Sequence, residues 1–362
     1  RDMPIIISTD IKPLNAQLLQ AFRTSLGSHE QLENLLFSVT LDNGIQGYGE
    51  AAIATHITGE TYQATLKCLE KSRSLCEGKR VGHFKEISKQ LHRAFSRNPA
   101  AIAAVETALL DAFTRDKKIP LWRYFGKSTH VLKSDITIVL SDLKQTQDSV
   151  QKFYAHGFRA FKVKIGHDLD LDVKRMLALK KCAPRSRITV DANQGYSSDE
   201  IIKFLDLLKK NKVRVDLLEL PVKKDDWEGL RKISRSTSVL VCADESVRTL
   251  EDARKAVKFK LAPVINIKIM KCGMLHAVAI AGLARKNNIK LMIGGMMETS
   301  IAMTASAHLA AGMGGFDYID LDTPFFIKGA VKRNPYLSED GHYNLKKVKA
   351  GIGIGPEQLY DQ

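Results

Sequence analysis

The sequence predicts an α/β fold in which a (β/α)8-type barrel, a modified TIM barrel, carries an α+β capping domain. Three observations lead to this fold class. The first 128 of the 362 residues place extended segments before helical ones, an order typical of α+β domains. From about residue 132, short apolar runs alternate with amphipathic stretches eight times. The polar residues that end these runs recur every 24 to 28 residues, which is the length of one βα unit.

The predicted capping domain, residues 1–128, starts with extended segments and continues with helices. IIISTDIKPL and LENLLFSVTLDNGIQGYGEA have strand character, and DNG within the second is a strong hairpin signal. The Ala-rich residues 98–119 predict a helix that ends before Pro120. The Gly-rich C-terminal tail has no βα pattern, so residues 329–362 are expected to return to this domain and complete it.

The predicted barrel, residues 129–328, contains eight strands that are near-continuous apolar runs, as expected for parallel strands buried on both faces. No low-complexity segment or flexible linker separates the barrel from the capping domain, so the two should pack tightly. The strands are expected at residues 135–141, 160–166, 186–193, 215–221, 239–246, 264–270, 290–296 and 317–324.

The composition excludes several classes of protein. Apolar residues make up 44% and charged residues 26% of the chain, which is ordinary for a globular enzyme, and no run approaches the ~18 apolar residues of a membrane span. The five cysteines are odd in number and lack CxxC spacing, which favours reduced thiols over disulfides or a zinc site. The start of the sequence has no apolar core of signal-peptide length. We therefore expect a cytoplasmic protein without a membrane partner.

The formal net charge of +15 raises the question of nucleic-acid binding. The lysines are spread over helix-like stretches, such as residues 205–216 and 252–260, and do not form one stripe with aromatic residues. We expect a solvated basic surface and no nucleic-acid partner. Such a surface can also raise the rate of encounter with anionic substrates.

Carboxylates follow three successive strands of the predicted barrel. Asp191, Glu219 and Asp244 stand at the C-terminal ends of these strands, on the rim where barrel enzymes build their active sites. Any one of them could be a helix cap or a surface group, but three can converge on one point. Converging anions in a partly buried site repel one another, so we expect them to bind one oxygen-liganded cation, Mg²⁺.

Lysines occupy two further strand ends. Lys162 and Lys164 point to one face of the second strand because side chains alternate with a period of two, and Lys268 ends the sixth strand. The apolar neighbours Phe161 and Val163 argue against a surface position. Lys164 and Lys268 should therefore lie across the mouth of the barrel from each other, where a neutral amine can act as a base.

The motifs that contain these residues resemble those of the enolase superfamily, and specifically its muconate-cycloisomerase-like subgroup. GYGEA in the capping domain and KVK, DAN, LELP, ADES and NIK at the strand ends carry the resemblance, which covers essentially the whole chain. Members of this superfamily pair a lysine or histidine base with Mg²⁺. The resemblance implies Asp191, Glu219 and Asp244 as ligands of one Mg²⁺, Lys164 and Lys268 as acid/base catalysts, Lys162 as the charge that stabilises the enolate, and Asn193 and Glu245 as groups around the ligands.

Within this subgroup, the segment DLDTP resembles the dipeptide epimerases. Asp320 and Asp322 match the carboxylates that hold the α-ammonium of a dipeptide in those enzymes, and they lie on one face of a strand. Asp322 could instead cap a following helix. Thr137 and Glu298 are further substrate-binding candidates. The implied activity is Mg²⁺-dependent inversion of the α-carbon of the C-terminal residue of a dipeptide, by 1,1-proton transfer between two bases through an enediolate, in a homo-oligomer.

One departure from the family pattern bears on the substrate. In L-Ala-D/L-Glu epimerases, an arginine in the loop after the first strand receives the glutamate side chain. The corresponding position here is Gly27, with Arg23 and His29 nearby but offset. This difference argues against Ala-Glu specificity and favours a neutral or hydrophobic second residue.

Three alternatives stand beside the epimerase interpretation. The same lysine pair and metal serve o-succinylbenzoate synthase and muconate cycloisomerase, but neither reaction has a use for Asp320 together with Asp322. A nucleic-acid-binding protein on a retired enzyme scaffold would show steeply salt-dependent affinity. A purely structural or interaction protein would have no reason to keep every catalytic position.

Overall fold

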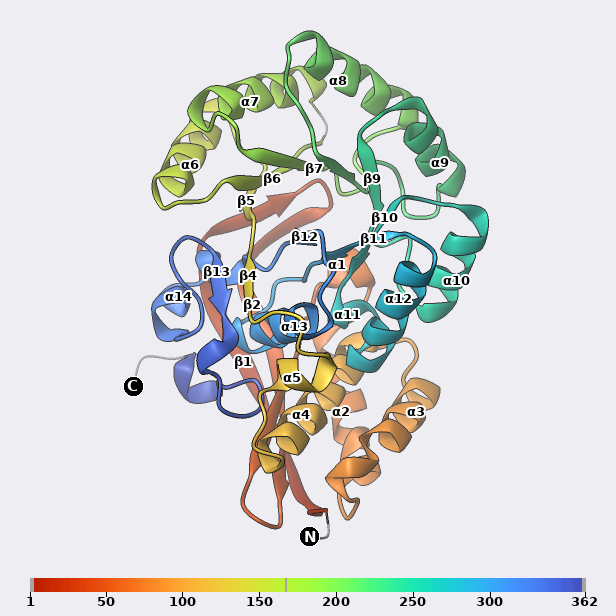
Figure 1. Cartoon of the computed structure of the whole chain (residues 1–362), viewed down its shortest axis with the longest axis vertical. Helices are drawn as coiled ribbons and strands as arrows, with labels where there is room; N and C mark the ends of the chain where they lie inside the picture. Colours follow the sequence, from red (N-terminus) through yellow and green to blue (C-terminus); the bar gives the residue numbers. More distant parts are fainter. Residues whose placement is uncertain (1–2, 167, 360–362) are drawn as a thin grey trace.

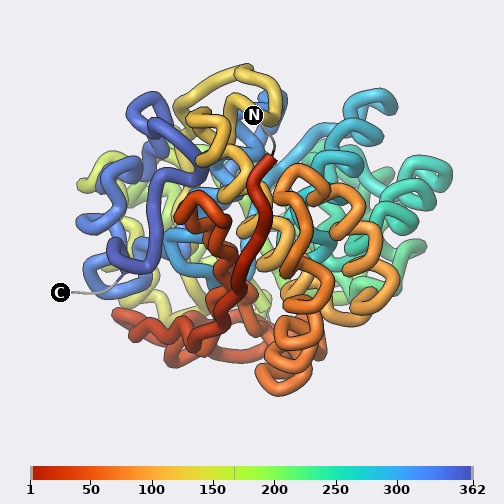
Figure 2. The backbone as a smooth tube through the Cα atoms, turned by 90° about the horizontal axis from the view of Figure 1, so that it is seen from below, coloured from red at the N-terminus to blue at the C-terminus, as the bar shows by residue number. Residues whose placement is uncertain are grey.

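The computed structural model of the protein describes residues 3–166 and 168–359. The barrel forms the green, cyan and light-blue part of the molecule, and the red and orange N-terminal elements lie against it (Figure 1). The C-terminal residues run beside the N-terminal strands (Figure 2), where the backbone N–H of Lys328 donates to the carbonyl of Gln17. Among the described residues, no helix combines the length and the apolar character needed to cross a membrane.

The capping domain begins with three antiparallel strands, β1 (Ile6–Thr24), β2 (Gly27–Leu41) and β3 (Gln46–Ala51), with β2 in the middle. The predicted DNG turn joins β2 to β3, and Gly44 there has a left-handed φ of +81° that glycine adopts at little cost. β1 extends beyond the predicted run because it pairs with β2 as a long ribbon, whose register is irregular after Gln17.

The predicted Ala-rich helix, α4 (Pro99–Asp116), packs against β3. The side chain of Asn98 caps this helix by accepting the N–H of Ala101, which satisfies one of the free donors of the first turn. A Cβ atom at Gly47 or Gly49 would collide with the backbone of α4, so both glycines of GYGEA are needed for this close approach. The other helices here are α1 (Thr55–Thr58), α2 (Tyr62–Cys76), η1 (Val81–His83), α3 (Phe84–Ala94) and α5 (Leu121–Phe125).

In the part of the chain that the structure describes, eight parallel strands form the barrel, one within each predicted run, and the predicted fold class is confirmed. Their order in the sheet follows their order in the chain. The N–H of Asp135, just before the first barrel strand, donates to the carbonyl of Ile319 in the last one at 2.8 Å, which joins the two edges of the sheet. The strands are β5 (Ile136–Ile138), β6 (Ala160–Lys164), β7 (Arg187–Asp191), β8 (Leu217–Glu219), β9 (Leu240–Ala243), β10 (Val264–Ile267), β11 (Lys290–Ile293) and β12 (Tyr318–Ile319).

The parallel register brings the predicted site residues to one end of the barrel. Lys164 stands beside Asp191, and Asp191 stands beside Glu219, as direct partners on neighbouring strands. Helices connect the strands and cover the outer face of the barrel, which leaves the strand ends free to carry the site. The helices are α6 (Leu143–Ala155), α7 (Leu169–Cys182), α8 (Ser198–Lys210), α9 (Trp227–Ser236), α10 (Leu250–Phe259), α11 (Ile269–Cys272), α12 (Met274–Lys286) and α13 (Ser300–Met313).

The C-terminal tail contacts both the connecting segment and the capping domain. β13 (His342–Asn344) pairs antiparallel with β4 (Val131–Lys133), and the N–H of Ile352 donates to Asp111 of α4 at 2.7 Å. The division into a capping domain of residues 1–128 and 329–362 and a barrel of residues 129–328 stays our proposal. The remaining elements are η2 (Thr323–Phe326), α14 (Ala330–Arg333), η3 (Leu345–Lys347) and η4 (Pro356–Gln358).

Glu50, the acidic residue of GYGEA, connects the capping domain to the barrel. Its side chain is 1% exposed and lies at the N-terminus of α13. It accepts the N–H and the hydroxyl of Thr299, at 2.8 and 2.7 Å, and the side-chain amide of Asn34 at 2.8 Å. A carboxylate at a helix N-terminus is stabilised by the free N–H groups there. The two parts of the chain are therefore held in one orientation over the strand ends.

His308 holds three segments together, and the pH dependence of stability should report it. Its Nδ1 accepts the N–H of Trp122 at 2.9 Å, so its Nε2 carries the proton toward the carbonyl of Ile352. Burial lowers the pKa of His308 from 6.5 to about 4. The unfolded chain therefore binds the proton first, and stability present above pH 6.5 is lost as the pH falls toward 4.

We expect the free energy of unfolding to be about 2 kcal/mol smaller at pH 5 than at pH 7.5 through this residue alone. Urea unfolding of the wild type and His308→Gln at both pH values measures the difference, which should be about 2 kcal/mol smaller in the variant. The same change at exposed His156 is the control and should keep the wild-type difference. An equal pH dependence in all three proteins would contradict this account.

Candidate active site

A cavity opens at the end of the barrel where the strands finish, beneath the capping domain. Its floor is polar and comes from the barrel, and its upper wall is largely apolar and comes from β1, β2, α1 and the segment after β11. The lining residues are Phe22, Thr24, His29, His56, Ile57, Thr137, Lys162, Lys164, Asn193, Glu245, Lys268, Gly295, Met296, Met297, Met303, Asp320, Asp322 and Thr323.

The three predicted metal ligands are buried at neighbouring strand ends. Asp191, Glu219 and Asp244 are each at most 1% exposed. Asp191 accepts a hydrogen bond from Lys164 at 2.6 Å, and Glu219 Oε2 lies 2.7 Å from the ammonium of Lys162. Burial raises the pKa of Glu219 to about 8, although the Lys162 charge opposes this shift. Each carboxylate thus has a cationic neighbour, but burial works against its charged form.

Asp244 is held by two lysines. Lys268 donates to its Oδ2 at 2.5 Å and Lys271 to its Oδ1 at 2.8 Å. Burial alone would raise the pKa of Asp244, but the two ammonium groups outweigh it and hold this pKa below its usual value. Burial would likewise lower the pKa of Lys268, but the Asp244 carboxylate outweighs it and raises that pKa. Lys271 also donates to the carbonyl of Asn266, which gives it a structural role.

The two predicted acid/base lysines line the cavity from opposite sides. Lys164 ends β6 and Lys268 follows β10, four strands away in a sheet of eight, so the two face each other across the barrel mouth. They are 6% and 5% exposed. Lys162 contacts three carboxylates, Asp191 at 3.2 Å and Glu219 and Asp320 at 2.7 Å. The ammonium of Lys162 therefore lies at the centre of the site.

The carboxylates at the ends of β7, β8 and β9 fit a hard cation such as Mg²⁺. Next to them, Asn193 Oδ1 and both carboxylate oxygens of Glu245 are buried without a hydrogen-bond donor among the described residues. The N–H of Asn193 donates to Asp191 at 2.8 Å, which places this residue at the ligands. Unpaired buried oxygens are costly, and an ion that keeps some of its water would satisfy them. The donor set and its surroundings therefore fit Mg²⁺.

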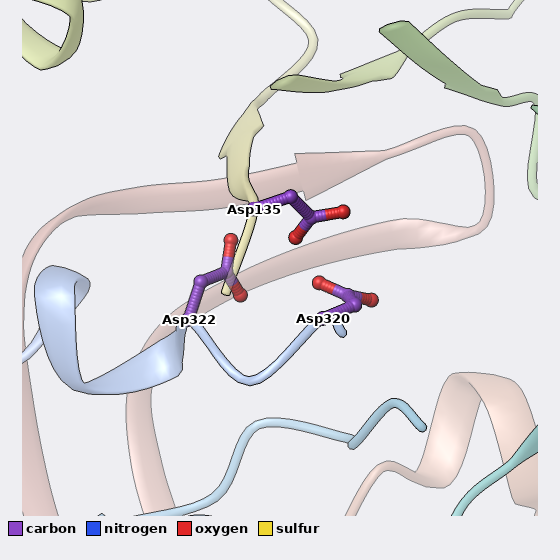
Figure 3. Close-up of side chains that lie close together, drawn as sticks. All are labelled: Asp135, Asp320 and Asp322. Atoms are coloured by element: carbon purple, nitrogen blue, oxygen red, sulfur yellow. The ribbon is translucent and has the colours of Figure 1, made fainter. Parts of the chain in front are cut away.

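A second group of carboxyls lies at the ends of the last and first strands. In residues 3–166 and 168–359, the trio whose oxygens come within 4.8 Å of one another is Asp135, Asp320 and Asp322, and not the predicted ligand trio. These three side chains point toward a common centre (Figure 3). Asp320 accepts from Lys162 at 2.7 Å, so the cluster already has one cationic partner. Asp135 is not among the predicted site residues, because it precedes its strand, whereas the predicted residues stand at or after the ends of theirs.

The two further substrate-binding candidates lie in different places. Thr137 lines the cavity, and its N–H donates to Asp322 Oδ2 at 2.6 Å. Glu298 is fully buried, and its carboxylate accepts the N–H of Met296 behind the cavity wall. Burial raises the pKa of Glu298 to about 8. Substrate binding by either residue stays a prediction.

Packing at the upper wall of the cavity accounts for the glycine at position 27, where the family pattern has an arginine. This residue has a φ of +153°, and a Cβ there would lie 3.1 Å from the ring of His56. The His56 ring in turn packs against that of His29, with 4.5 Å between ring centres. Burial, and then the neighbouring His56, lower the pKa of His29 to about 4. Two neutral imidazoles therefore lie beside Gly27, the position at which the family pattern leads us to expect an arginine.

A cavity of about 790 Å³ opens at the opposite end of the barrel, where the strands begin. Arg187, Lys212 and Arg214 are part of its lining, together with Asp206 and Asp216. Barrel enzymes place their chemistry at the other end, and the lysines and carboxylates described above lie there. We therefore assign the active site to the cavity beneath the capping domain.

Two family models match the chain over most of its length. Residues 6–126 match the mandelate racemase / muconate lactonizing enzyme, N-terminal domain, and residues 145–359 match the enolase C-terminal domain-like family. With the barrel, the capping domain and the lysine and carboxylate positions, these matches define the class. The chain belongs to the mandelate racemase / muconate lactonizing enzyme family, and the resemblance to the enolase superfamily is confirmed.

Within this family the chain is similar to dipeptide epimerases. It is 43% identical to the hydrophobic dipeptide epimerase of Citrifermentans bemidjiense over 95% of each chain. It is 35% identical to the aromatic dipeptide epimerase of Herpetosiphon aurantiacus, over 97% of this chain and 99% of the relative. The solved dipeptide epimerase of Enterococcus faecalis, complexed with Mg and the dipeptide L-Leu-L-Tyr, matches with a TM-score of 0.92 at 29% identity, over 97% of this chain and 99% of that one.

Proposed function

We propose that this protein is an Mg²⁺-dependent dipeptide epimerase that inverts the α-carbon of the C-terminal residue of a dipeptide. One observation carries the proposal: Lys164 and Lys268 face each other across a cavity whose other charged groups are mainly carboxylates. An epimerase must remove a proton from one face of a carbon atom and deliver a proton to the other face, so it needs two such groups. The similarity to dipeptide epimerases over nearly the whole chain supports the assignment.

The two ends of a dipeptide match the two acidic groups of the site. Asp320 and Asp322 suit the α-ammonium of the substrate, because paired carboxylates stabilise a cation. Asp191, Glu219 and Asp244 would hold the Mg²⁺ ion. When bound, Mg²⁺ supplies positive charge against the anionic enediolate. The distinct chemistry of the two groups orients the substrate with its C-terminal residue between the lysines.

The proton transfer uses the two lysines in turn. One of them, as the neutral amine, accepts the α-proton on Nζ, and the other, as the ammonium, returns a proton to the opposite face. The α-proton beside a carboxylate is very weakly acidic, so stabilisation of the enediolate is the main requirement. The buried charge of Lys162 contributes to it, and single donors in comparable sites are worth ~3 kcal/mol.

The cavity wall favours a neutral second residue. Phe22, Ile57, Met297 and the neutral His29–His56 pair form this wall, and none of them offers a fixed positive charge. Burial of an unpaired carboxylate costs several kcal/mol. Hydrophobic and aromatic C-terminal residues should therefore be better substrates than glutamate.

Substrate preference gives a direct prediction. We expect kcat/KM for L-Ala-L-Phe or L-Ala-L-Leu to exceed that for L-Ala-L-Glu by at least about 100-fold, which corresponds to ~2.7 kcal/mol. His29→Arg should reduce this ratio, because it adds a permanent charge to the wall. His29→Leu is the matched control and should keep the preference for neutral residues. A higher kcat/KM of the wild type for L-Ala-L-Glu than for the neutral dipeptides would contradict the proposal that this wall favours a neutral second residue.

Turnover in deuterated water tests the function itself. The Mg²⁺-loaded enzyme is incubated with a dipeptide library, and mass spectrometry detects deuterium at the α-carbon of the C-terminal residue. N-acylated dipeptides serve as the comparison, because they lack the cation that Asp320 and Asp322 should recognise. Inversion without deuterium incorporation would rule out proton abstraction by solvent-exchangeable bases.

We further infer a cytoplasmic homo-oligomer. Support comes from β1, an edge strand of its sheet on which Ile7 and Leu19 are each 58% exposed. Large exposed apolar side chains on an edge strand favour association with another chain. Light scattering of the purified protein measures the molecular mass.

A further inference from the structure

Asp135 is a buried carboxyl group to which the two-lysine scheme gives no role. It precedes β5, is 7% exposed, and has one carboxyl oxygen within 4.8 Å of oxygens of both Asp320 and Asp322. Figure 3 shows all three side chains pointing into one small volume. Asp135 Oδ1 is buried and has no hydrogen-bond donor among the described residues.

Unlike Asp135 Oδ1, the carboxylates of Asp320 and Asp322 each accept a hydrogen bond. Lys162 donates to Asp320 Oδ2 at 2.7 Å, and the N–H of Thr137 donates to Asp322 Oδ2 at 2.6 Å. The titratable groups that act on Asp135 are Asp320 and Asp322 beyond β12 and Lys162 on β6. Burial, and then the charges of Asp320 and Asp322, raise the pKa of Asp135 well above its usual value, although Lys162 opposes this.

The local charge balance shows why a proton belongs in this cluster. Three ionised carboxylates would face one lysine, which Asp191 and Glu219 also share. A bound substrate ammonium would add one positive charge and still leave one carboxylate unbalanced in a buried site. Two carboxyl groups that share a proton remove that excess charge and gain a charge-assisted hydrogen bond.

We propose that Asp135 is a neutral carboxylic acid whose O–H donates a hydrogen bond to the Asp320 carboxylate and thereby positions the Asp320–Asp322 pair for the substrate ammonium. This inference rests on the proposed function for the identity of the ligand. Asp135 acts here as a positioning residue, and Asp320 and Asp322 make the contact with the substrate. A second cation in the cluster would be the competing explanation, but the ammonium of Lys162 already contacts Asp320.

The kinetic test compares Asp135→Asn with Asp135→Ala in the Mg²⁺-loaded enzyme. Asparagine is neutral and keeps a donor toward Asp320, so KM for free dipeptides should stay within about threefold of the wild type. Alanine removes the donor, and KM should rise about 10- to 100-fold, the range for a hydrogen bond to a charged group, while kcat changes less. N-acetyl dipeptides, tested as competitive inhibitors, should bind all three proteins alike. Asp148→Asn on the exposed face of α6 is the control.

An infrared difference spectrum tests the protonation state without turnover. The wild type minus Asp135→Asn should show the carbonyl band of a protonated carboxylic acid at neutral pH. This measurement remains decisive if Asp135→Ala does not fold or if the protein epimerises no dipeptide. The absence of the band, or an Asn variant whose KM rises as much as that of the Ala variant, would overturn the inference. So would a high-affinity second metal ion that is lost in Asp135→Asn.

Discussion

Replacement of Lys268 with alanine is expected to abolish epimerisation and to leave Mg²⁺ binding intact. Lys268 follows β10 and is one of the two groups that can exchange a proton with the α-carbon. Its loss removes a general acid/base that contributes roughly 100- to 10,000-fold. Among the described residues that line the cavity, the other lysines, Lys162 and Lys164, both lie on β6. Asp244 keeps Lys271 as a partner, so the carboxylate trio should remain in place.

Polarimetry measures inversion in this variant, and calorimetric titration measures Mg²⁺ affinity. Because Lys164 remains, one epimer of the substrate should still exchange its α-proton with deuterated water without inversion. Lys164→Ala should show the same behaviour for the other epimer. Lys290→Ala, an exposed lysine at the far end of the barrel, should behave as the wild type. Inversion at a normal rate in Lys268→Ala would refute the two-base scheme.

Loss of the Mg²⁺ ion should reduce epimerisation about as strongly as the loss of Lys268. A chelator should abolish turnover of the wild type, and added Mg²⁺ should restore it. Glu219→Gln replaces one carboxylate oxygen with an amide and leaves the shape of the side chain nearly unchanged. The Mg²⁺ affinity of this variant should fall by at least about 100-fold. Mutation of a group that only holds a metal ligand in place already lowers metal affinity by roughly 10- to 100-fold, and Glu219 is a predicted ligand itself.

The control for this variant is Glu251→Gln, an exposed residue in the first turn of α10. Calorimetry should give it the wild-type Mg²⁺ affinity. Circular dichroism should show that Glu219→Gln retains the fold, because Asn266 can still donate to the remaining carbonyl oxygen. A Glu219→Gln variant with unchanged affinity would mean that the ion binds elsewhere, and the Asp135–Asp320–Asp322 cluster would then be the first place to look.

The barrel could be predicted because its evidence is local. Each strand is a short apolar run that ends in a polar residue, and parallel strands align those ends on one rim. Lys164, Asp191 and Glu219 therefore had to be neighbours once the runs were recognised, and the register confirms that they are. The roles of these residues stay predictions until the variants above are measured.

The role of Lys162 could not be predicted from the alternation of side chains alone. That pattern places Lys162 and Lys164 on one face, which suggests two like charges side by side. The structure gives each of them carboxylate partners from other strands, Asp191 for both and Glu219 and Asp320 for Lys162 alone. Which carboxylate a buried lysine meets depends on the curvature of the sheet, and no local pattern contains that information.

By itself, the sequence determined the fold class, the rim that carries the site and the main chemical groups on it. These follow from hydrophobic periodicity and from the spacing of the strand ends, both of which act over a few residues. The tertiary structure alone decided the position of Asp135 beside Asp320 and of His56 in the space next to Gly27. The physical reason is that closure of the barrel and the docking of the capping domain bring together segments that are distant in the chain.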